Sequence, residues 1–313
     1  MPEGAKSSWK ASRRVVGRPR QQNRESVGQR QYRERGPLGD GSTLTKPKTD
    51  TSFTTDVALL YESTLVHLIF RPYARDLAER ARDLAPSSVL EIACGTGVVT
   101  RALAEALSEE CDIVATDLNE AMVAHGREVG TTRTVTWRQA DVMALPYAEA
   151  IFDVVVCQFS VMFFPVRVAA YREVRRVLRP GGSFLFNVWN SIEQNEFADV
   201  VTKAVSALYP QDPPQFLART PHGHGSPTEI ESDVRNAGFE TCALIQRDEV
   251  SVAAAPRLPA VAYCQGTPLR NEILAREPDG LERATAVAEK ALASRFGVGR
   301  IEGRISGVVA VAS

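Results

Sequence analysis

Short apolar segments that read as strands alternate with amphipathic segments that read as helices through the middle of this 313-residue chain. Such alternation is typical of a parallel β-sheet with helices on both faces, because parallel neighbours need a crossover connection. It limits the chain to the α/β class. The predicted strands are Val89–Ala93, Ile113–Thr116, Thr134–Arg138, Phe152–Cys157 and Ser183–Trp189, and helices are predicted over Asn119–Glu128 and Val168–Leu178.

Further elements are predicted on both sides of this region. Before it, Pro72 interrupts a helical pattern and predicts two helices. After it, Ser226 opens a predicted capping box and a helix to about Asn236. Residues 239–252 read as a long edge strand, residues 257–297 as helical segments, and the chain closes on the apolar strand "GRISGVVAVA".

Charge is distributed unevenly along the chain. The net charge is −1, yet residues 1–50 carry twelve Lys and Arg against five Asp and Glu, so the remainder is acidic. An acidic body disfavours binding to nucleic acid phosphates. Residues 1–52 lack apolar periodicity and are predicted to be a disordered basic arm, either a solvated tail or an arm for nucleic acid or an anionic surface. Arg175, Arg176 and Arg179 are expected in the last turns of a helix, where they complement its dipole without a phosphate ligand.

Cysteine usage and hydropathy point to a compartment. The five cysteines are scattered, odd in number and without a CxxC pair, which is typical of a reducing cytosol. No run approaches the roughly 18 consecutive apolar residues of a membrane span, and the basic N-terminus lacks the apolar segment of a secretory signal. We therefore expect a cytoplasmic protein without membrane association. Its oligomeric state stays open, with a homodimer possible.

The junction "VLEIACGTGVVTRAL" places two glycines where the first strand ends and a helix begins. Gly95 and Gly97 allow a ligand to approach the main chain, and free N–H groups at the helix start favour polar or anionic ligand groups. A tight packing turn is the alternative explanation for this pattern taken alone. Other strand ends strengthen the ligand interpretation, because Asp117 ends the second strand, Asp141 follows the third and Gln158 follows the fourth.

Two nucleoside cofactors suit such a crevice. A dinucleotide such as NAD prefers G-x-G-x-x-G, whereas the third position here is Thr100. Glu91 would also repel a pyrophosphate, but it suits the ammonium group of a methionine tail. An NAD-linked oxidoreductase thus remains the less favoured alternative, together with a non-catalytic regulator that binds the cofactor or a nucleotide.

Four motifs, "VLEIACGTG", "VATDLN", "ADVMALPYAEAIFDVVVCQFSVMFFP" and "EVRRVLRPGGSFLFNVW", resemble those of class I S-adenosylmethionine-dependent methyltransferases of the ubiquinone/menaquinone-biosynthesis-like (type 11) group. The resemblance is strong over residues 56–190 and extends over most of 226–313. It implies S-adenosylmethionine as cofactor and a Rossmann-like, mostly parallel sheet in the order 3-2-1-4-5-7-6, with helices on both faces and the last strand antiparallel. Relatives often have Gly where this chain has Ala93, a departure expected to cost little because the residue stays small. The implied cofactor-binding residues are Glu91, Ala93, Cys94, Gly95 and Gly97 at the methionine end, Asp117 and Leu118 at the ribose and adenine, Asp141 and Val142 at the adenine edge, and Gln158 with Phe159 beside the sulfonium.

Methyl transfer from a sulfonium needs positioning and exclusion of water, not a metal, and no metal site is expected. The segment "QFSVMFFP" is apolar and lacks the Asn/Asp-Pro-Pro-Tyr sequence of enzymes that clamp a planar amide or amine. A small organic acceptor with an apolar part is therefore expected. No catalytic residue stands out; Tyr61, His222 and His224 are weak candidates, since loop histidines are usually solvated and a helical tyrosine usually packs.

The methyltransferase domain is predicted to span residues 53–313. Residues 208–227 form a Pro- and Gly-rich loop that is too long for a plain connection and is a candidate lid. Residues 256–300 are predicted to be a helical cap inserted between the last two strands, over the acceptor pocket. A peripheral decoration or a dimer surface is the alternative for this insertion.

Overall fold

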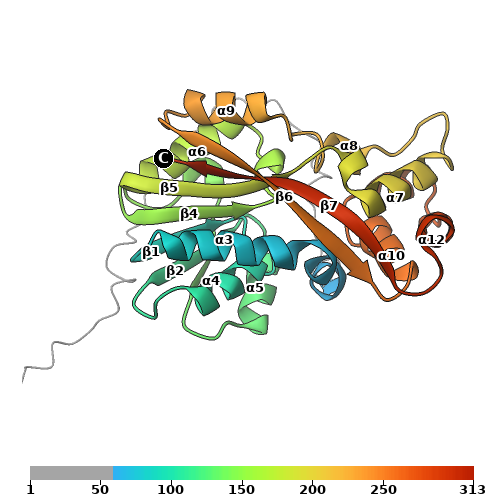
Figure 1. Cartoon of the computed structure of the whole chain (residues 1–313), viewed down its shortest axis with the longest axis horizontal. Coiled ribbons are helices and arrows are strands. Elements are labelled where there is room, and N and C mark those ends of the chain that lie inside the picture. Colours follow the sequence, from blue (N-terminus) through green and yellow to red (C-terminus); the bar gives the residue numbers. More distant parts are fainter. Residues whose placement is uncertain (1–58) are drawn as a thin grey trace, which may run out of the picture.

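The computed structural model describes residues 59–313 (Figure 1). The predicted basic arm, residues 1–52, lies outside these residues. Within them, no helix is long and apolar enough to cross a membrane. The elements in chain order are η2 (Tyr61–Phe70), α3 (Arg71–Asp83), β1 (Ser88–Ile92), α4 (Val98–Ala106), β2 (Asp112–Asp117), α5 (Glu120–Val129), β3 (Thr136–Gln139), η3 (Val142–Ala144), β4 (Phe152–Gln158), η4 (Val161–Phe163), α6 (Arg167–Val177), β5 (Leu178–Trp189), η5 (Ile192–Gln194), α7 (Glu196–Ser206), α8 (Phe216–Arg219), α9 (Pro227–Asn236), β6 (Cys242–Ala253), α10 (Arg257–Gln265), α11 (Leu269–Arg276), α12 (Leu281–Phe296) and β7 (Ile301–Ala312).

One sheet organises the described part of the chain. Its seven strands follow the order β3-β2-β1-β4-β5-β7-β6, and this confirms the predicted topology. The pairs from β3 to β5 are parallel, whereas β7 pairs antiparallel with both β5 and β6. The order reverses between β1 and β4, and open α/β sheets bind ligands at the carboxyl ends of the strands beside such a switch point.

Helices cover both faces of the sheet. On one face, Leu77 of α3 and Leu103 of α4 are fully buried with Val89 of β1 in one apolar cluster. On the other face, Val174 of α6 and Ile230 of α9 belong to a second and larger apolar cluster. The central strands β1 and β4 are buried on both sides, which explains why their sequences read as nearly continuous apolar runs.

Helices from the C-terminal half gather at one end of the sheet. Figure 1 shows α7, α8, α10 and α12 together beyond the end of β5, on the right of the view. Parallel strands run toward that end, so these helices lie over the strand ends where a ligand is expected. Residues 256–300, the predicted insertion between the last two strands, contain α10, α11 and α12.

Two helical elements meet beside Pro72 as predicted, the π-helical η2 and α3, but they are continuous. Pro72 lies in the first turn of α3, where no intrahelical N–H bond is needed. Two other local predictions were wrong. Arg179 lies in β5 and pairs with Asp153, because β5 begins at Leu178 and its register against β4 shifts beside Gly181. Ser226 precedes α9 as predicted, but its side chain makes no capping hydrogen bond.

Candidate active site

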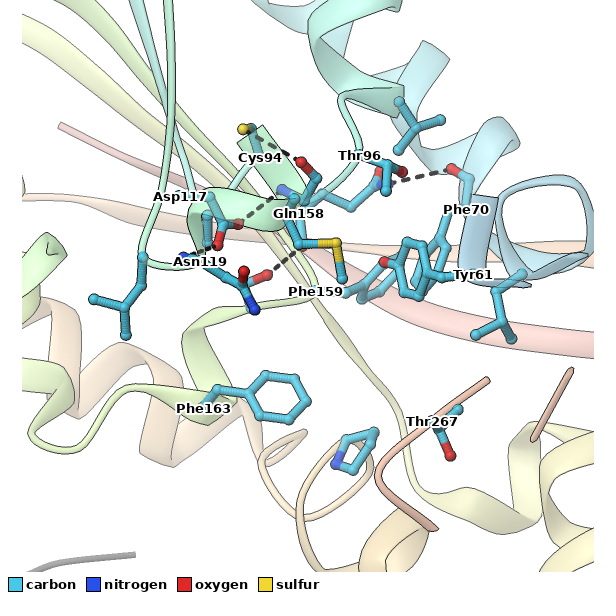
Figure 2. A pocket seen from close by; sticks show the side chains of 18 of the residues that line it. Tyr61, Phe70, Cys94, Thr96, Asp117, Asn119, Gln158, Phe159, Phe163 and Thr267 are labelled. Atoms are coloured by element: carbon cyan, nitrogen blue, oxygen red, sulfur yellow. Dashed lines mark hydrogen bonds between the residues drawn. The ribbon is translucent and has the colours of Figure 1, made fainter. Parts of the chain in front are cut away.

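A cavity of about 700 Å³ lies at the carboxyl ends of the strands. This size suits a small-molecule site. We call its two walls the strand side and the cover side. The strand side consists of Glu91–Thr96, Asp117–Glu120, Asp141–Val142 and Gln158–Phe159, and the cover side of Ser160, Phe163, Asn195, Phe216, Leu217, His222, Tyr263 and Thr267. In Figure 2, Phe163 and Thr267 face the labelled strand-side residues across the open space.

The turn after β1 is held in left-handed backbone conformations. Ala93, Gly95 and Gly97 have φ of 52°, 54° and 86°. Ala93 therefore occupies a position that favours glycine, at a cost of about 1–2 kcal/mol. Gly97 does not line the cavity; a Cβ there would lie 2.5 Å from Cη2 of Trp137, so this glycine permits packing instead of ligand contact. Gly95 lines the cavity, and a Cβ there would meet no heavy atom within 4 Å.

Asp117 links the ends of β1 and β2. Its carboxylate accepts a hydrogen bond from the Gly95 N–H at 2.8 Å and another from the Asn119 N–H at 2.8 Å. Burial raises the pKa of Asp117, while these N–H donors favour the ionised form. Beside it, the Leu118 side chain is 58% exposed at the cavity. A carboxylate next to an unpacked apolar side chain is a combination that suits a sugar and its attached base.

Glu91 is the most deeply buried carboxylate of the cavity, with 1% of its surface exposed. Thr100 Oγ1 donates a hydrogen bond to it at 2.5 Å. Burial is the main cause that raises the pKa of Glu91 to about 8, against the lowering effects of Thr100 and Arg101. A ligand that places a positive charge beside this carboxyl group would stabilise its ionised form.

Asp141 lies at the more open edge of the strand side. It accepts a hydrogen bond from the Met143 N–H at 2.8 Å and thereby caps η3, while Val142 follows as a partly buried neighbour. Both residues line the cavity. Backbone contacts thus fix the direction of the Asp141 carboxylate beside the end of β3.

Gln158 ends β4 next to the switch point, and Phe159 follows it. Gln158 Nε2 donates to the Phe70 carbonyl at 3.4 Å, and its Oε1 is buried with no hydrogen-bond partner among the described residues (Figure 2). Phe159 has φ of 47°, unusual for an aromatic residue. Its N–H donates to Asn187 Oδ1 at 2.8 Å, and its ring stacks on Trp189 with centroids 3.5 Å apart. These contacts hold a strained conformation, of the kind found at functional sites.

The helix η2 is fixed against the β1–α4 turn. Glu62 accepts a hydrogen bond from Thr96 Oγ1 at 2.5 Å and pairs with Arg101 at 2.6 Å. Tyr61 beside it stacks on Phe70 with centroids 5.1 Å apart and lines the cavity. Burial, followed by the charges of Asp117 and Glu62, raises the pKa of Tyr61, so its phenol is neutral at physiological pH.

The cover side is largely apolar and carries no formal charge. Phe163 and Phe216 lie with ring centroids 6.4 Å apart, and Tyr263 from α10 is buried. Thr267 Oγ1 is occupied by the Tyr263 carbonyl at 2.6 Å. Among the described residues that line the cavity, none is Lys or Arg, and the acidic ones, Glu91, Asp117, Glu120 and Asp141, all belong to the strand side.

The two candidate histidines have different surroundings. His222 lines the cavity, with Nδ1 2.9 Å from the Asn190 carbonyl, and burial lowers its pKa to about 4. His224 is not among the cavity-lining residues; it is 3% exposed and lies 3.5 Å from Glu229 and 3.8 Å from Asp233. The expectation that both are solvated loop residues was wrong, because the loop packs against the end of β5.

Sequence reasoning missed several residues of the site. Trp189, Phe216 and Tyr263 line the cavity but come from segments far apart in the chain. Only Trp189 carried a usable signal, since it ends a predicted strand. The predicted cofactor-binding residues other than Gly97 do line the cavity, and so does the catalytic candidate Tyr61. No group of three or more His, Cys, Asp or Glu side chains suited to a metal ion occurs in residues 59–313.

Comparisons with known proteins identify the family and the fold. A family model described as a methyltransferase domain matches residues 90–186. The ubiquinone/menaquinone biosynthesis C-methyltransferase UbiE of Yersinia enterocolitica is 28% identical over 188 residues, which cover 56% of this chain and 74% of that protein. UbiE of Idiomarina loihiensis is 29% identical over the same length. A solved structure of Haemonchus contortus phosphoethanolamine N-methyltransferase 2 with S-adenosyl-L-methionine superposes with a TM-score of 0.52 at 14% identity, covering 84% of this chain and 58% of that chain; it shares the fold.

Proposed function

Because the chain is a class I S-adenosylmethionine-dependent methyltransferase, we propose that it transfers the methyl group to a small organic acceptor held on the cover side of the cavity. The observation that carries this proposal is the division of one cavity into two walls. Acidic side chains and open backbone occupy the strand side, while aromatic rings occupy the cover side. A polar cofactor and an apolar acceptor can thus meet near Gln158 and Phe159.

The strand side fits S-adenosylmethionine. Glu91 is buried, and Thr100, which donates a hydrogen bond to it, is uncharged, so its carboxyl group suits the ammonium group of the methionine end. Asp117 suits the ribose hydroxyls, since a carboxylate accepts two hydrogen bonds, and Leu118 and Val142 offer apolar contact to the adenine. The open space beside Gly95 leaves room for the amino-acid part of the cofactor. Gln158 Oε1, buried without a partner, is left for the sulfonium end.

The cofactor supplies a methyl group on a positively charged sulfur, which leaves as a neutral thioether. The residues of this chain then have two tasks, to align the acceptor and to exclude water. Phe159, Phe163 and Trp189 provide an apolar boundary between the walls. Residues 208–227 and α10–α12 (within residues 256–300) are proposed as the lid and the cap that close it.

Isothermal titration with S-adenosylhomocysteine tests the cofactor half of the proposal. We expect saturable binding with one site per chain. The acceptor half is tested by incubating enzyme and cofactor with a cell metabolite extract and searching by mass spectrometry for products that gain one methylene mass. Binding without any such product would favour a cofactor-binding regulator, and absence of binding would contradict the proposal.

The cellular compartment is a second part of this proposal. All five cysteines are free thiols, and Cys94, Cys111, Cys157 and Cys264 are buried. Unpaired cysteines are usual where the medium is reducing. We place the enzyme in the cytoplasm on that ground, and fractionation with an antibody against the native chain tests it.

A further inference from the structure

We propose that His222 is the catalytic residue that receives the acceptor: its Nε2 accepts a hydrogen bond from a hydroxyl of an uncharged acceptor and takes the proton as the methyl group is transferred. This inference rests on the proposed function and deepens it. It assigns a substrate class, an uncharged hydroxyl compound with an apolar body, and a proton acceptor.

The first argument concerns the tautomer of His222. Its Nδ1 lies 2.9 Å from the Asn190 carbonyl, which can only accept, so Nδ1 carries the proton. Nε2 then holds a lone pair, and no hydrogen bond joins it to another described residue. Since His222 lines the cavity, that lone pair is available to a ligand.

The second argument concerns what fixes the Asn190 carbonyl. The Asn190 side chain donates to Ser306 Oγ at 2.9 Å, and its N–H donates to the Ser306 carbonyl at 3.0 Å. Asn195 Oδ1 accepts from the Ser306 N–H at 3.0 Å. All three residues are buried. This network between β5, η5 and β7 holds the imidazole as second-layer contacts hold functional histidines elsewhere.

The approach of the loop to Asn190 depends on its glycines. A Cβ at Gly225 would lie 2.6 Å from the Trp189 carbonyl, and one at Gly223 would lie 2.0 Å from the Arg219 carbonyl. The sequence "HGHG" therefore lets the backbone press close enough for His222 to reach Asn190. The ring of His222 lies 6.0 Å from that of Trp189, which in turn stacks on Phe159 at the end of β4.

The third argument concerns charge. Among the described cavity-lining residues, no Lys or Arg is present to bind an anionic acceptor, and no carboxylate lies on the cover side to bind a cationic one. The side chains of Thr267 and Asn195 already form hydrogen bonds within the chain. Ser160 Oγ on the same wall donates to the Gln158 carbonyl at 3.0 Å. Of the cover-side residues defined above, Tyr263 and His222 offer a hydroxyl and Nε2 to an acceptor. Both are uncharged at neutral pH, because burial raises the pKa of Tyr263 and lowers that of His222 to about 4.

The chemistry balances with these groups. The acceptor oxygen forms a bond to the methyl carbon as the carbon–sulfur bond breaks, and the electron pair of that bond goes to sulfur. The oxygen becomes positive as it bonds to carbon, and its proton passes to Nε2. A protonated ether is a far stronger acid than an imidazolium, so even a weakly basic buried histidine can take this proton.

Binding to the protein saturated with S-adenosylhomocysteine tests the substrate class. Naphthol, naphthoate and naphthylmethylammonium serve as shape-matched uncharged, anionic and cationic probes, observed by saturation-transfer NMR. We expect naphthol to bind at least tenfold more tightly than the two ions in the wild type and in His224→Gln, the matched control. His222→Phe should lower naphthol affinity about tenfold, the loss of one buried hydrogen bond, whereas His222→Gln should retain most of it.

Turnover tests the proton transfer. With the metabolite extract, His222→Phe should form the methylated product at least ~100-fold more slowly than the wild type, the usual contribution of a general base. Unchanged turnover or unchanged naphthol binding in His222→Phe overturns the inference. So does naphthol binding no better than naphthoate, or a loss of discrimination in Tyr263→Phe instead. If the wild type does not bind S-adenosylhomocysteine, the proposed function itself is contradicted.

Discussion

Asp117 connects the backbone of the site to the ligand proposed for it. Its two oxygens already accept N–H groups of Gly95 and Asn119 at 2.8 Å, and each oxygen has a second lone pair for a ribose hydroxyl. We expect Asp117→Asn to weaken S-adenosylhomocysteine binding ~100-fold, because hydrogen bonds to a charged group are about 1.5–3 kcal/mol each. Isothermal titration measures this loss. Asp112→Asn at the exposed start of β2 is the control, and equal affinities of both variants would contradict the assignment.

Glu91 predicts a proton linked to cofactor binding. Its pKa in the free protein is raised from 4.5 to about 8, so the folded protein carries a proton there near neutral pH. The stability linked to this proton is complete below about pH 4.5 and falls as the pH rises from about 4.5 to about 8. An ammonium group beside it would favour the carboxylate, and the proton would be released. We expect the binding enthalpy of S-adenosylhomocysteine near pH 7 to differ between phosphate and Tris buffers by the equivalent of about one proton.

The variant Glu91→Gln tests whether the proton released on cofactor binding comes from Glu91. It should bind more weakly, with an enthalpy that no longer depends on the buffer. Asp141→Asn, at the open edge of the same wall, should retain the dependence. A wild-type enthalpy that is the same in both buffers would show that Glu91 is already ionised or does not meet the ammonium.

At the scale of elements, the two glycines of the β1–α4 turn have separable roles. Gly95→Ala should destabilise the fold by only about 1 kcal/mol, the cost of a left-handed conformation, because its Cβ meets no atom. Gly97→Ala should cost about 3 kcal/mol, since its Cβ also collides with Trp137. Urea unfolding measures both. For S-adenosylhomocysteine affinity the order should reverse, because only Gly95 lines the cavity; similar effects of the two variants on both measurements would contradict this division.

How far elements can be predicted from sequence follows from the range of the interactions that form them. The strands and βα junctions are marked by local apolar runs, and the order of the strands follows from the resemblance, so the sheet and most of the strand side were predicted. The π-helical form of η2, which ends at Phe70, and the start of β5 at Leu178 depend on what packs against them. The burial of His222 depends on Asn190, thirty-two residues away. No local pattern contains such a contact.

At the scale of the whole molecule, ligand and fold should be coupled. The cavity is lined by residues from Tyr61 to Ile305, so a ligand joins segments from most of the described chain. At one hundred times its dissociation constant, S-adenosylhomocysteine should stabilise the protein by about 2.7 kcal/mol. This corresponds to a rise in Tm of roughly 5–10 °C for a domain of this size. Differential scanning fluorimetry measures it.

NADH provides the comparison for that measurement. Thr100 stands where a dinucleotide site prefers a third glycine, so NADH should leave Tm unchanged. A shift with NADH and none with S-adenosylhomocysteine would favour the oxidoreductase alternative.

β7 lies between β5 and β6 although it follows both in the chain. On the ribosome, β5 is therefore made with one side unpaired, and β6 emerges with no neighbour to join until some fifty residues later. Nascent chains of this protein must pass through a stage in which two unpaired strand edges can pair with other chains. Chaperones protect chains in such a stage. A chain truncated shortly before Ile301 would lack β7 and keep both edges unpaired, so such truncated chains should aggregate rather than form enzymes of low activity.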